Sequence, residues 1–318
     1  MSTKTYSDAG KTALAECMRA DPTIWAVGED LGRGGVFGQY MGLEEEFGPE
    51  RIVSTPISEA AIMGSAVGGA LTGTRPVVEL RFADFALCAV DEMVNQAAKA
   101  RYMFGGQAKV PLVIRQPSGM WRSSAAQHSQ SLEAWYAHIP GLVVLMPSTP
   151  ADNYGLLKAA IECDDPVVYM EHKDLWSLEG EVPGGHTVEI GKAHVVQEGR
   201  DVTIVTWSKT CHVAAEAAGA LAASGTSVEL IDLRSLWPWD RECVLASAAK
   251  TGRLLVAHEA VRDGGFGAEV AATAAEEIAG LKLARLGAPR IPIPYAPPLE
   301  DVCGTMACHG SVRAGRRL

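Results

Sequence analysis

The 318-residue sequence lacks any apolar run close to the roughly 20 residues that a membrane-spanning helix needs. Its first segment, Met1–Tyr6, also lacks the apolar core of a secretion signal. These two absences predict a protein that does not cross a membrane and is not exported. We therefore expect a cytoplasmic location.

Positive charge is scarce, because 28 Lys and Arg residues face 38 Asp and Glu residues, for a formal net charge of -10. Nucleic acids and anionic membranes attract clustered Lys and Arg side chains. The charge balance therefore disfavours both as partners. Arg313, Arg316 and Arg317 near the C-terminus are too few to reverse this balance and are expected to form a solvated tail.

Paired cysteines are also missing, since the seven cysteines are odd in number, scattered, and never spaced as C-x-x-C. We expect them to be reduced and mostly buried; they are Cys17, Cys88, Cys163, Cys211, Cys243, Cys303 and Cys308. Only Cys303, Cys308 and His309 suggest a metal cluster. Three ligands without a second knuckle do not make a structural zinc site.

The chain does contain enough apolar residues, 47% of the total, for two domains with a core each. In its first half, apolar β-branched runs alternate with helical patterns and show no period of two, which is typical of strands buried on both faces of a parallel sheet. Helices are predicted over 85–102 and 151–163. The predicted strands are Thr23–Val27, Arg51–Thr55, Arg75–Leu80, Val110–Ile114, Leu142–Met146 and Pro166–Met170.

A glycine- and proline-rich stretch without periodicity divides the chain. We predict an α/β domain over 1–178, a linker over 179–191, and a second, smaller α/β domain over 192–318. Each should be a three-layer domain with a largely parallel sheet. In the second domain we expect strands at Asp201–Val205, Ser227–Ile231 and Arg253–Ala257, and helices at about Lys209–Ala223, Asp240–Lys250 and Gly267–Ile278.

One carboxylate stands where a strand passes into a helix. The predicted strand ending at Thr55 runs into Pro56, and Glu59 is the only ionisable residue of the predicted helix Ser58–Thr72. A helix without a polar face is expected to be buried all round, which would desolvate Glu59 unless a ligand or partner meets it. The alternative is that Glu59 only serves the helix start, with Ser58 or Thr55 as the cap.

Motifs spread over almost the full length resemble the beta subunit of the thiamine-diphosphate-dependent 2-oxo acid dehydrogenase component, and they occur in that family's order. They are Val27-Gly-Glu-Asp30, Thr55-Pro-Ile-Ser-Glu59-Ala, Arg81-Phe-Ala-Asp-Phe85, Asn95 to Met103, Gln127-His-Ser-Gln-Ser131, Pro140-Gly-Leu, Pro147-Ser-Thr-Pro150, Gly264-Gly-Phe-Gly267 and Tyr295-Ala-Pro-Pro-Leu-Glu-Asp301. The resemblance implies a transketolase-like pyrimidine-binding domain followed by a transketolase-type C-terminal domain.

The resemblance assigns roles to several residues. In that family a glutamate at the position of Glu59 hydrogen-bonds the aminopyrimidine of thiamine diphosphate, and Phe85 holds the position that stacks on this ring. Ile57 and Glu29 match further positions that line the cofactor. On the residues alone, Phe85 would be a core residue and Glu29 would cap the next element.

His128 lies in a polar loop and, by the same resemblance, faces the substrate channel, where it orients or protonates the bound substrate or the incoming lipoyl group. This chain departs from the family just upstream. It reads Gly119-Met-Trp-Arg-Ser-Ser124, where many relatives have a run of glycines.

The resemblance also implies two metals. Relatives hold a monovalent cation, commonly K⁺, through backbone carbonyls, and the matching positions are Leu112, Ala160, Ile161, Cys163 and Asp165. The G-D-G and asparagine pattern that holds Mg²⁺ and the diphosphate in the companion chain is missing here. We therefore expect an alpha subunit to supply it, in an assembly of two alpha and two beta chains, with close packing allowed by Gly64, Gly68 and Gly69.

The expected function is thus that of the beta subunit of a dehydrogenase that decarboxylates a 2-oxo acid and passes the acyl group to a lipoyl domain on a dihydrolipoamide acyltransferase core. Pyruvate is the expected substrate, and acetoin or a branched-chain 2-oxo acid is the alternative. A non-catalytic assembly subunit and a split transketolase half remain open. The glycines of Gly32–Gly38 are spaced wrongly for dinucleotide binding, and Gly264–Gly267 lacks the Lys-Ser/Thr of a P-loop.

Overall fold

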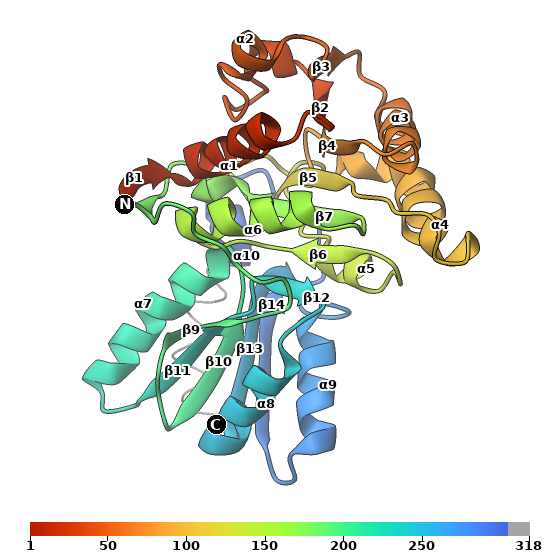
Figure 1. The fold of residues 1–318 in the computed structure, drawn as a ribbon. Coiled ribbons are helices and arrows are strands. Elements are labelled where there is room, and N and C mark those ends of the chain that lie inside the picture. Colours follow the sequence, from red (N-terminus) through yellow and green to blue (C-terminus); the bar gives the residue numbers. More distant parts are fainter. Residues whose placement is uncertain (305–318) are drawn as a thin grey trace. The chain divides into compact units, whose positions relative to one another are not determined.

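A computed structural model describes residues 1–304 in two compact units (Figure 1). The first comprises residues 1–118 and 135–190, and the second comprises 119–134 and the chain from Gly191 onward. The segment 119–134 therefore groups with the second unit, although the first unit surrounds it in sequence. Cys308, His309 and the three C-terminal arginines named above lie outside the described residues.

The first unit is built on a parallel sheet whose strands lie in the order β6-β7-β5-β4-β2-β3. They are β2 (Ile24–Glu29), β3 (Ile52–Thr55), β4 (Arg75–Glu79), β5 (Val113–Ser118), β6 (Val143–Leu145) and β7 (Val167–His172). Strands β5 and β7 are buried along their whole length, as expected for a sheet covered on both faces.

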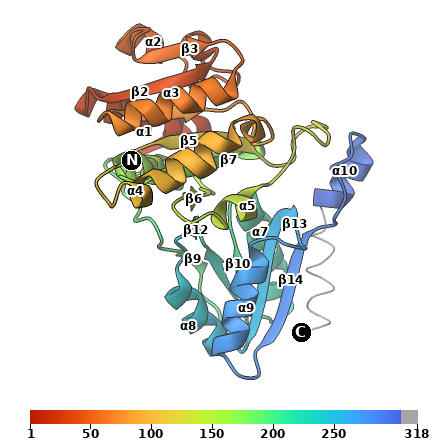
Figure 2. The same ribbon diagram turned by 90° about the vertical axis from the view of Figure 1, so that its right-hand side faces the viewer.

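Helices cover both faces of this sheet. Figures 1 and 2 show α1 (Tyr6–Ala20) and α6 (Pro150–Glu162) on one face, and α3 (Glu59–Leu71) and α4 (Ala98–Met103) on the other. Thr5 and Thr149 cap α1 and α6 by accepting the amides of Asp8 and Asp152. The segment before α4 is irregular, with a 3-10 turn at Phe85–Ala89 and a π-helical stretch at Glu92–Ala97.

Short elements complete the first unit. They are the helix α2 (Leu43–Phe47), two 3-10 turns (Leu31–Arg33 and Lys173–Leu175), and an antiparallel pair of β1 (Ser2–Thr5) with β8 (Glu179–Val182). Residues 179–190, which we expected in a linker, thus belong to the first unit. The short helix α5 (Glu133–Ala137) spans the point where the chain passes between the units.

The second unit holds a sheet in the order β14-β13-β10-β11-β9, in which only β9 is antiparallel. Helix α7 packs on one face, while α8 and α9 lie together on the other (Figure 1). Its strands are β9 (His194–Gln197), β10 (Val202–Thr206), β11 (Val228–Asp232), β12 (Ser235–Trp237), β13 (Arg253–Val261) and β14 (Lys282–Ala288). Its helices are α7 (Lys209–Ala223), α8 (Arg241–Thr251), α9 (Gly267–Glu277) and α10 (Pro297–Gly304).

Both units are therefore α/β with largely parallel sheets, as predicted. The strands β1, β8, β9, β12 and β14 and the helix α1 were not predicted from the sequence. Two glycines at the start of α9 serve close packing, since a Cβ on Gly265 or Gly267 would lie 2.5 or 2.8 Å from the ring of His258. Among the described residues, no helix is long and apolar enough to cross a membrane.

Candidate functional site

The carboxyl ends of β2 and β3 bring two acidic residues to one edge of the first sheet. Glu29 is the last residue of β2 and lies opposite Thr55, the last residue of β3. After Thr55 the chain turns at Pro56, and Glu59 is the first residue of α3. Because the carboxyl ends of parallel strands share an edge, and ligands of open α/β sheets bind there, this edge is the candidate site.

Glu59 is half-buried, and no hydrogen bond or ion pair engages its carboxylate among residues 1–304. The helix start does not use the expected caps. The Ser58 side chain makes no capping bond, and the buried Oγ1 of Thr55 lacks a hydrogen-bond partner within the described chain. The capping alternative for Ser58 and Thr55 is therefore wrong. The Glu59 carboxylate and, four residues earlier in the chain, the Thr55 hydroxyl are thus both available to a polar ligand.

Charge couples Glu29 to Glu59. Burial raises the pKa of Glu29 above its ordinary value, the positive charge of Arg81 lowers it, and the negative charge of Glu59 raises it further. Arg81 Nε lies 3.3 Å from Glu29 Oε2, and Arg81 Nη2 lies 2.7 Å from Asp30 Oδ2. The structure thus brings together two of the predicted cofactor residues and adds Arg81 to them.

Aromatic rings follow β4. The ring of Phe85 packs edge-on against Phe82, with centroids 5.3 Å apart, and Phe82 in turn packs edge-on against Phe37 at 5.8 Å. Lys173 Nζ lies 4.8 Å from the centroid of Phe82. Phe85 is half-buried, so part of its surface remains open to a ligand. Ile57 is 74% exposed, which is unusual for an isoleucine and suits a position that a ligand or partner covers.

Helix α3 is not buried all round, which corrects the expectation from its composition. Within this chain one face of the helix stays open. The exposed residues are Ala60, Ala61, Gly64, Ser65, Gly68 and Leu71. A Cβ on Gly68 would meet nothing within 4 Å, so the intramolecular packing does not require this glycine.

His128 belongs to the second unit, in the segment Gly119–Leu132, which we call the histidine loop. The histidine is half-buried, and its backbone amide donates to Ala125 O at 3.4 Å. Arg122, Ser123 and Ala125 have φ angles of 46°, 59° and 62°, in the left-handed region that favours glycine. Each such residue costs on the order of 1 kcal/mol. The chain therefore adopts a glycine-like backbone at three positions that are not glycine.

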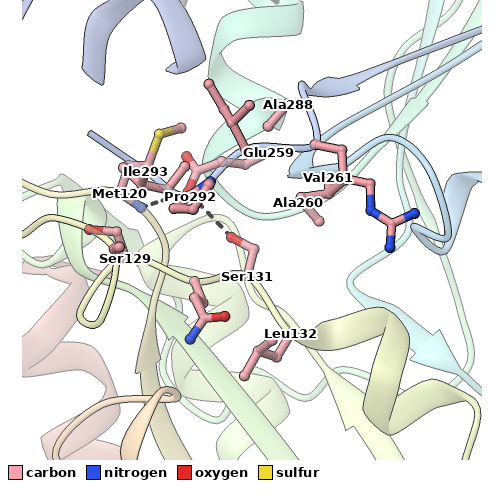
Figure 3. A pocket seen from close by; sticks show the side chains of 14 residues that line it. Met120, Ser129, Ser131, Leu132, Glu259, Ala260, Val261, Ala288, Pro292 and Ile293 are labelled. Carbon is pink, nitrogen blue, oxygen red and sulfur yellow. Dashed lines mark hydrogen bonds between the residues drawn. The ribbon is translucent and has the colours of Figure 1, made fainter. Parts of the chain in front are cut away.

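A cavity of about 350 Å³ lies beside the histidine loop within the second unit (Figure 3). Three segments line it: the histidine loop, the end of β13, and the chain at and beyond the end of β14. The lining residues are Met120, Ala126, Ser129–Leu132, Glu259–Val261, Ala288 and Arg290–Ile293. Its walls are mixed, with the aliphatic side chains of Ile291 and Ile293 and the polar side chains of Ser129 and Ser131. The histidine loop is therefore one wall of a pocket of ligand size.

The carbonyls predicted to bind K⁺ are partly engaged by the protein itself. Arg75 Nη1 donates to Ile161 O at 3.0 Å and to Cys163 O at 3.1 Å, and its Nη2 lies 2.7 Å from Asp164 Oδ1. Leu112 O accepts the amide of Val167. A cation at this place would have to share two of its predicted ligands with a guanidinium group.

A buried polar network that joins strands β4, β5 and β7 was not predicted. Arg115 is 1% exposed and makes two hydrogen bonds to Glu171, at 2.8 and 2.9 Å. Glu79 lies 3.7 Å from Arg115 and accepts the hydroxyl of Tyr40 at 3.0 Å. Burial raises the pKa of Glu79 to about 7, although the charge of Arg115 opposes this. Nothing in the sequence pattern indicates the network, because its members come from separate strands and loops.

Comparison with known proteins shows to which class of proteins this chain belongs. Residues 2–177 match the transketolase pyrimidine-binding domain, and residues 191–309 match the transketolase C-terminal domain. A chain titled as a split-gene transketolase, inactive beta4 tetramer, superposes with a TM-score of 0.81 at 26% identity, covering 97% of both chains. The fold and the domain order thus define a transketolase-type protein.

Curated relatives narrow this class. The chain is 43% identical over 307 residues to the 2-oxoisovalerate dehydrogenase subunit beta of Bacillus subtilis, covering 94% of each chain. It is 43% identical over 305 residues to an acetoin:2,6-dichlorophenolindophenol oxidoreductase subunit beta of Cupriavidus necator (91% of this chain, 90% of the relative). It is equally 43% identical over 305 residues to a mitochondrial pyruvate dehydrogenase E1 component subunit beta-2 of Oryza sativa (93% and 81%).

The chain belongs to the family of beta subunits of 2-oxo acid dehydrogenase E1 components, which confirms the resemblance drawn from its motifs. Membership in this family implies thiamine diphosphate as the cofactor and an alpha subunit as the partner. The residues at the carboxyl ends of β2 and β3 fit the aminopyrimidine of that cofactor. The carboxylate of Glu59 is available, the hydroxyl of Thr55 lacks a partner among the described residues, and Phe85 offers a partly exposed ring.

Proposed function

We propose that this chain supplies the aminopyrimidine half of a thiamine diphosphate site and that Glu59 is its catalytic residue. One observation carries the proposal: a half-buried carboxylate without a partner in the described chain stands at the start of α3, at the carboxyl edge of a parallel sheet. A carboxylate there can hold or release a proton at a ring nitrogen of the aminopyrimidine. Thiamine diphosphate, when bound, supplies the electron sink that decarboxylation needs.

The neighbouring residues would hold the ring in place. Phe85 would stack on the aminopyrimidine, an interaction worth on the order of 1 kcal/mol beyond burial. Ile57, which is 74% exposed in this chain, would cover an apolar edge of the cofactor. Glu29, which ends the neighbouring strand β2, would line the cofactor beside Glu59. His128 would serve the substrate or the lipoyl group as a proton donor or an orienting group.

The alpha subunit would complete the site. This sequence has no G-D-G and asparagine pattern for Mg²⁺ and the diphosphate, so we propose that the alpha chain holds both. The exposed face of α3, with its small residues, permits close packing of another helix against it. The relative titled as an inactive beta4 tetramer supports the view that such beta chains do not act alone. We further propose an assembly of two alpha and two beta chains that docks to a dihydrolipoamide acyltransferase core.

The proposed reaction is decarboxylation of a 2-oxo acid and transfer of the acyl group to a lipoyl domain, with pyruvate as the first substrate to test. Relatives named for 2-oxoisovalerate, acetoin and pyruvate are all 43% identical to this chain, so identity does not separate these substrates. Split transketolase activity is less favoured, because that relative shares only 26% identity. The K⁺ site and the cytoplasmic location stay predictions.

The test is to coexpress this chain with its alpha partner and to assay pyruvate, branched-chain 2-oxo acids and acetoin. We expect activity only when both chains are present. Glu59→Gln should keep assembly and lose about 100-fold or more of the turnover. Glu45→Gln, an exposed glutamate on α2, is the matched control and should retain full activity. Near wild-type turnover by Glu59→Gln would refute the catalytic assignment and favour a purely assembling subunit.

A further inference from the structure

Two glutamates that lie far away in the sequence contact the backbone of the histidine loop. Met120 N, near its start, donates to Glu259 Oε1 at 2.7 Å. Ser123 N donates to Glu300 Oε2 at 2.8 Å. A backbone N–H that donates to a carboxylate forms one of the stronger hydrogen bonds in proteins. The loop is thus held at two points by charged acceptors.

Glu259 also joins the two ends of the loop. The same Oε1 that accepts Met120 N lies 3.4 Å from Ser131 Oγ, as the dashed lines of Figure 3 show. Gly119 N donates to Gln130 O at 3.3 Å beside this contact. Glu259 lies where the pairing of β13 with β14 shifts register, between Ala257 and Val261. Such a bulge turns a side chain away from the regular direction of the strand, here toward the loop.

Glu300 acts nearer the middle of the loop. It lies on α10, and its contact with Ser123 N falls within the stretch where Arg122, Ser123 and Ala125 have positive φ. A strained backbone persists only where its surroundings over-determine it. The two glutamates supply that restraint for a loop whose left-handed positions are not glycine.

We propose that Glu259 and Glu300 are positioning residues that clamp the histidine loop and thereby set the place of His128. This inference rests on the proposed function only through the role of His128. The clamp itself is a statement about the amides of Met120 and Ser123 and can be measured without any turnover.

The first test is hydrogen exchange of the full chain in its assembly with the alpha subunit, read by mass spectrometry on peptides covering 119–124. Glu259→Ala should speed exchange at Met120, and Glu300→Ala at Ser123, each by about tenfold or more, as expected for loss of a bond to a charged acceptor. Glu259→Gln retains a carbonyl acceptor in place and should keep most of the protection. Glu276→Ala, an exposed residue of α9, is the matched control and should change neither amide.

The second test separates positioning from general stability. Glu259→Ala should lower kcat about tenfold with little change in KM, and it should add little further loss in a His128→Ala background, because it acts through that side chain. Unchanged exchange at both amides in the alanine variants would overturn the clamp. Full and additive loss in the His128→Ala background would overturn the positioning role. Neither result depends on Glu59. The clamp and the catalytic role of Glu59 are therefore tested independently of each other.

Discussion

Glu133, the first residue of α5, is a buried carboxyl group whose ionisation should make the second unit lose stability as the pH rises. It is 1% exposed, Trp207 Nε1 donates to its Oε1 at 3.2 Å, and its Oε2 has no hydrogen-bond partner among residues 1–304. Burial raises the pKa of Glu133 from 4.5 to about 7, while its own backbone amide and Trp207 lower it and the charge of Glu259 raises it.

The direction in which stability changes with pH follows from the number of protons that the folded and unfolded states bind. Between about pH 4.5 and pH 7 the folded state holds a proton on Glu133 that the unfolded state has released. The stabilising contribution is therefore complete below about pH 4.5 and is lost as the pH rises through about 7. A tenfold difference in proton affinity is worth about 1.4 kcal/mol, so the full loss is about 3 kcal/mol.

The perturbation is Glu133→Gln, which keeps the shape and an acceptor for Trp207 but cannot ionise. The melting temperature of the second unit, measured by calorimetry at about pH 5 and about pH 8, is the readout. The melting temperature of the variant relative to that of the wild type should be higher at about pH 8 than at about pH 5. The shift should be on the order of 5–10 °C for 3 kcal/mol in a unit of this size.

Two comparisons isolate the effect. Burial also raises the pKa of Glu79 to about 7, so the first unit should lose stability with pH in the same direction in both proteins. Subtracting wild type from variant removes that contribution. Glu242→Gln, an exposed residue of α8, should show no pH-dependent difference. A difference for Glu133→Gln that stays constant with pH would refute the reasoning, because it would mean that Glu133 ionises in the fold as it does in water.

Two further predictions concern the first unit. Arg115→Met should leave Glu171 and Glu79 buried without their counter-charge and cost about 3–5 kcal/mol, seen as a lower melting temperature; Lys109→Met, which breaks the exposed pair with Asp164, should cost about 1 kcal/mol or less. An equal cost for both would argue against the buried network. Arg75→Ala should free Ile161 O and Cys163 O, so replacing choline chloride by KCl should raise the melting temperature more in the variant than in wild type. An identical response in both would show that Arg75 and K⁺ do not compete.

The candidate site could be predicted from the sequence to the extent that it is local. Glu59 follows a strand by a few residues, and Glu29 ends the neighbouring parallel strand, so the geometry of a parallel sheet brings them to one edge. The expectation that α3 is fully buried was wrong. The amino-acid composition of a helix indicates that its side chains are apolar, but it does not indicate whether the same chain supplies the residues that would bury them. An apolar helix face of small residues can be exposed in the single chain and become buried when another chain binds.

The rest of the site depends on contacts between residues far apart in the sequence. Glu259 and Glu300 lie 139 and 177 residues from the amides they accept, and neither belongs to a pattern that marks a loop contact. The departure from a glycine run at 119–124 was visible in the sequence, yet it indicated only that loop properties of relatives do not transfer. Positive φ angles at Arg122, Ser123 and Ala125 show a strained backbone there, which the two carboxylates restrain. Glycine adopts such angles without strain, so glycines at these three positions should make the loop less dependent on that restraint. In a variant of this chain with those glycines, Glu259→Ala should cost less activity than it costs in the wild-type background.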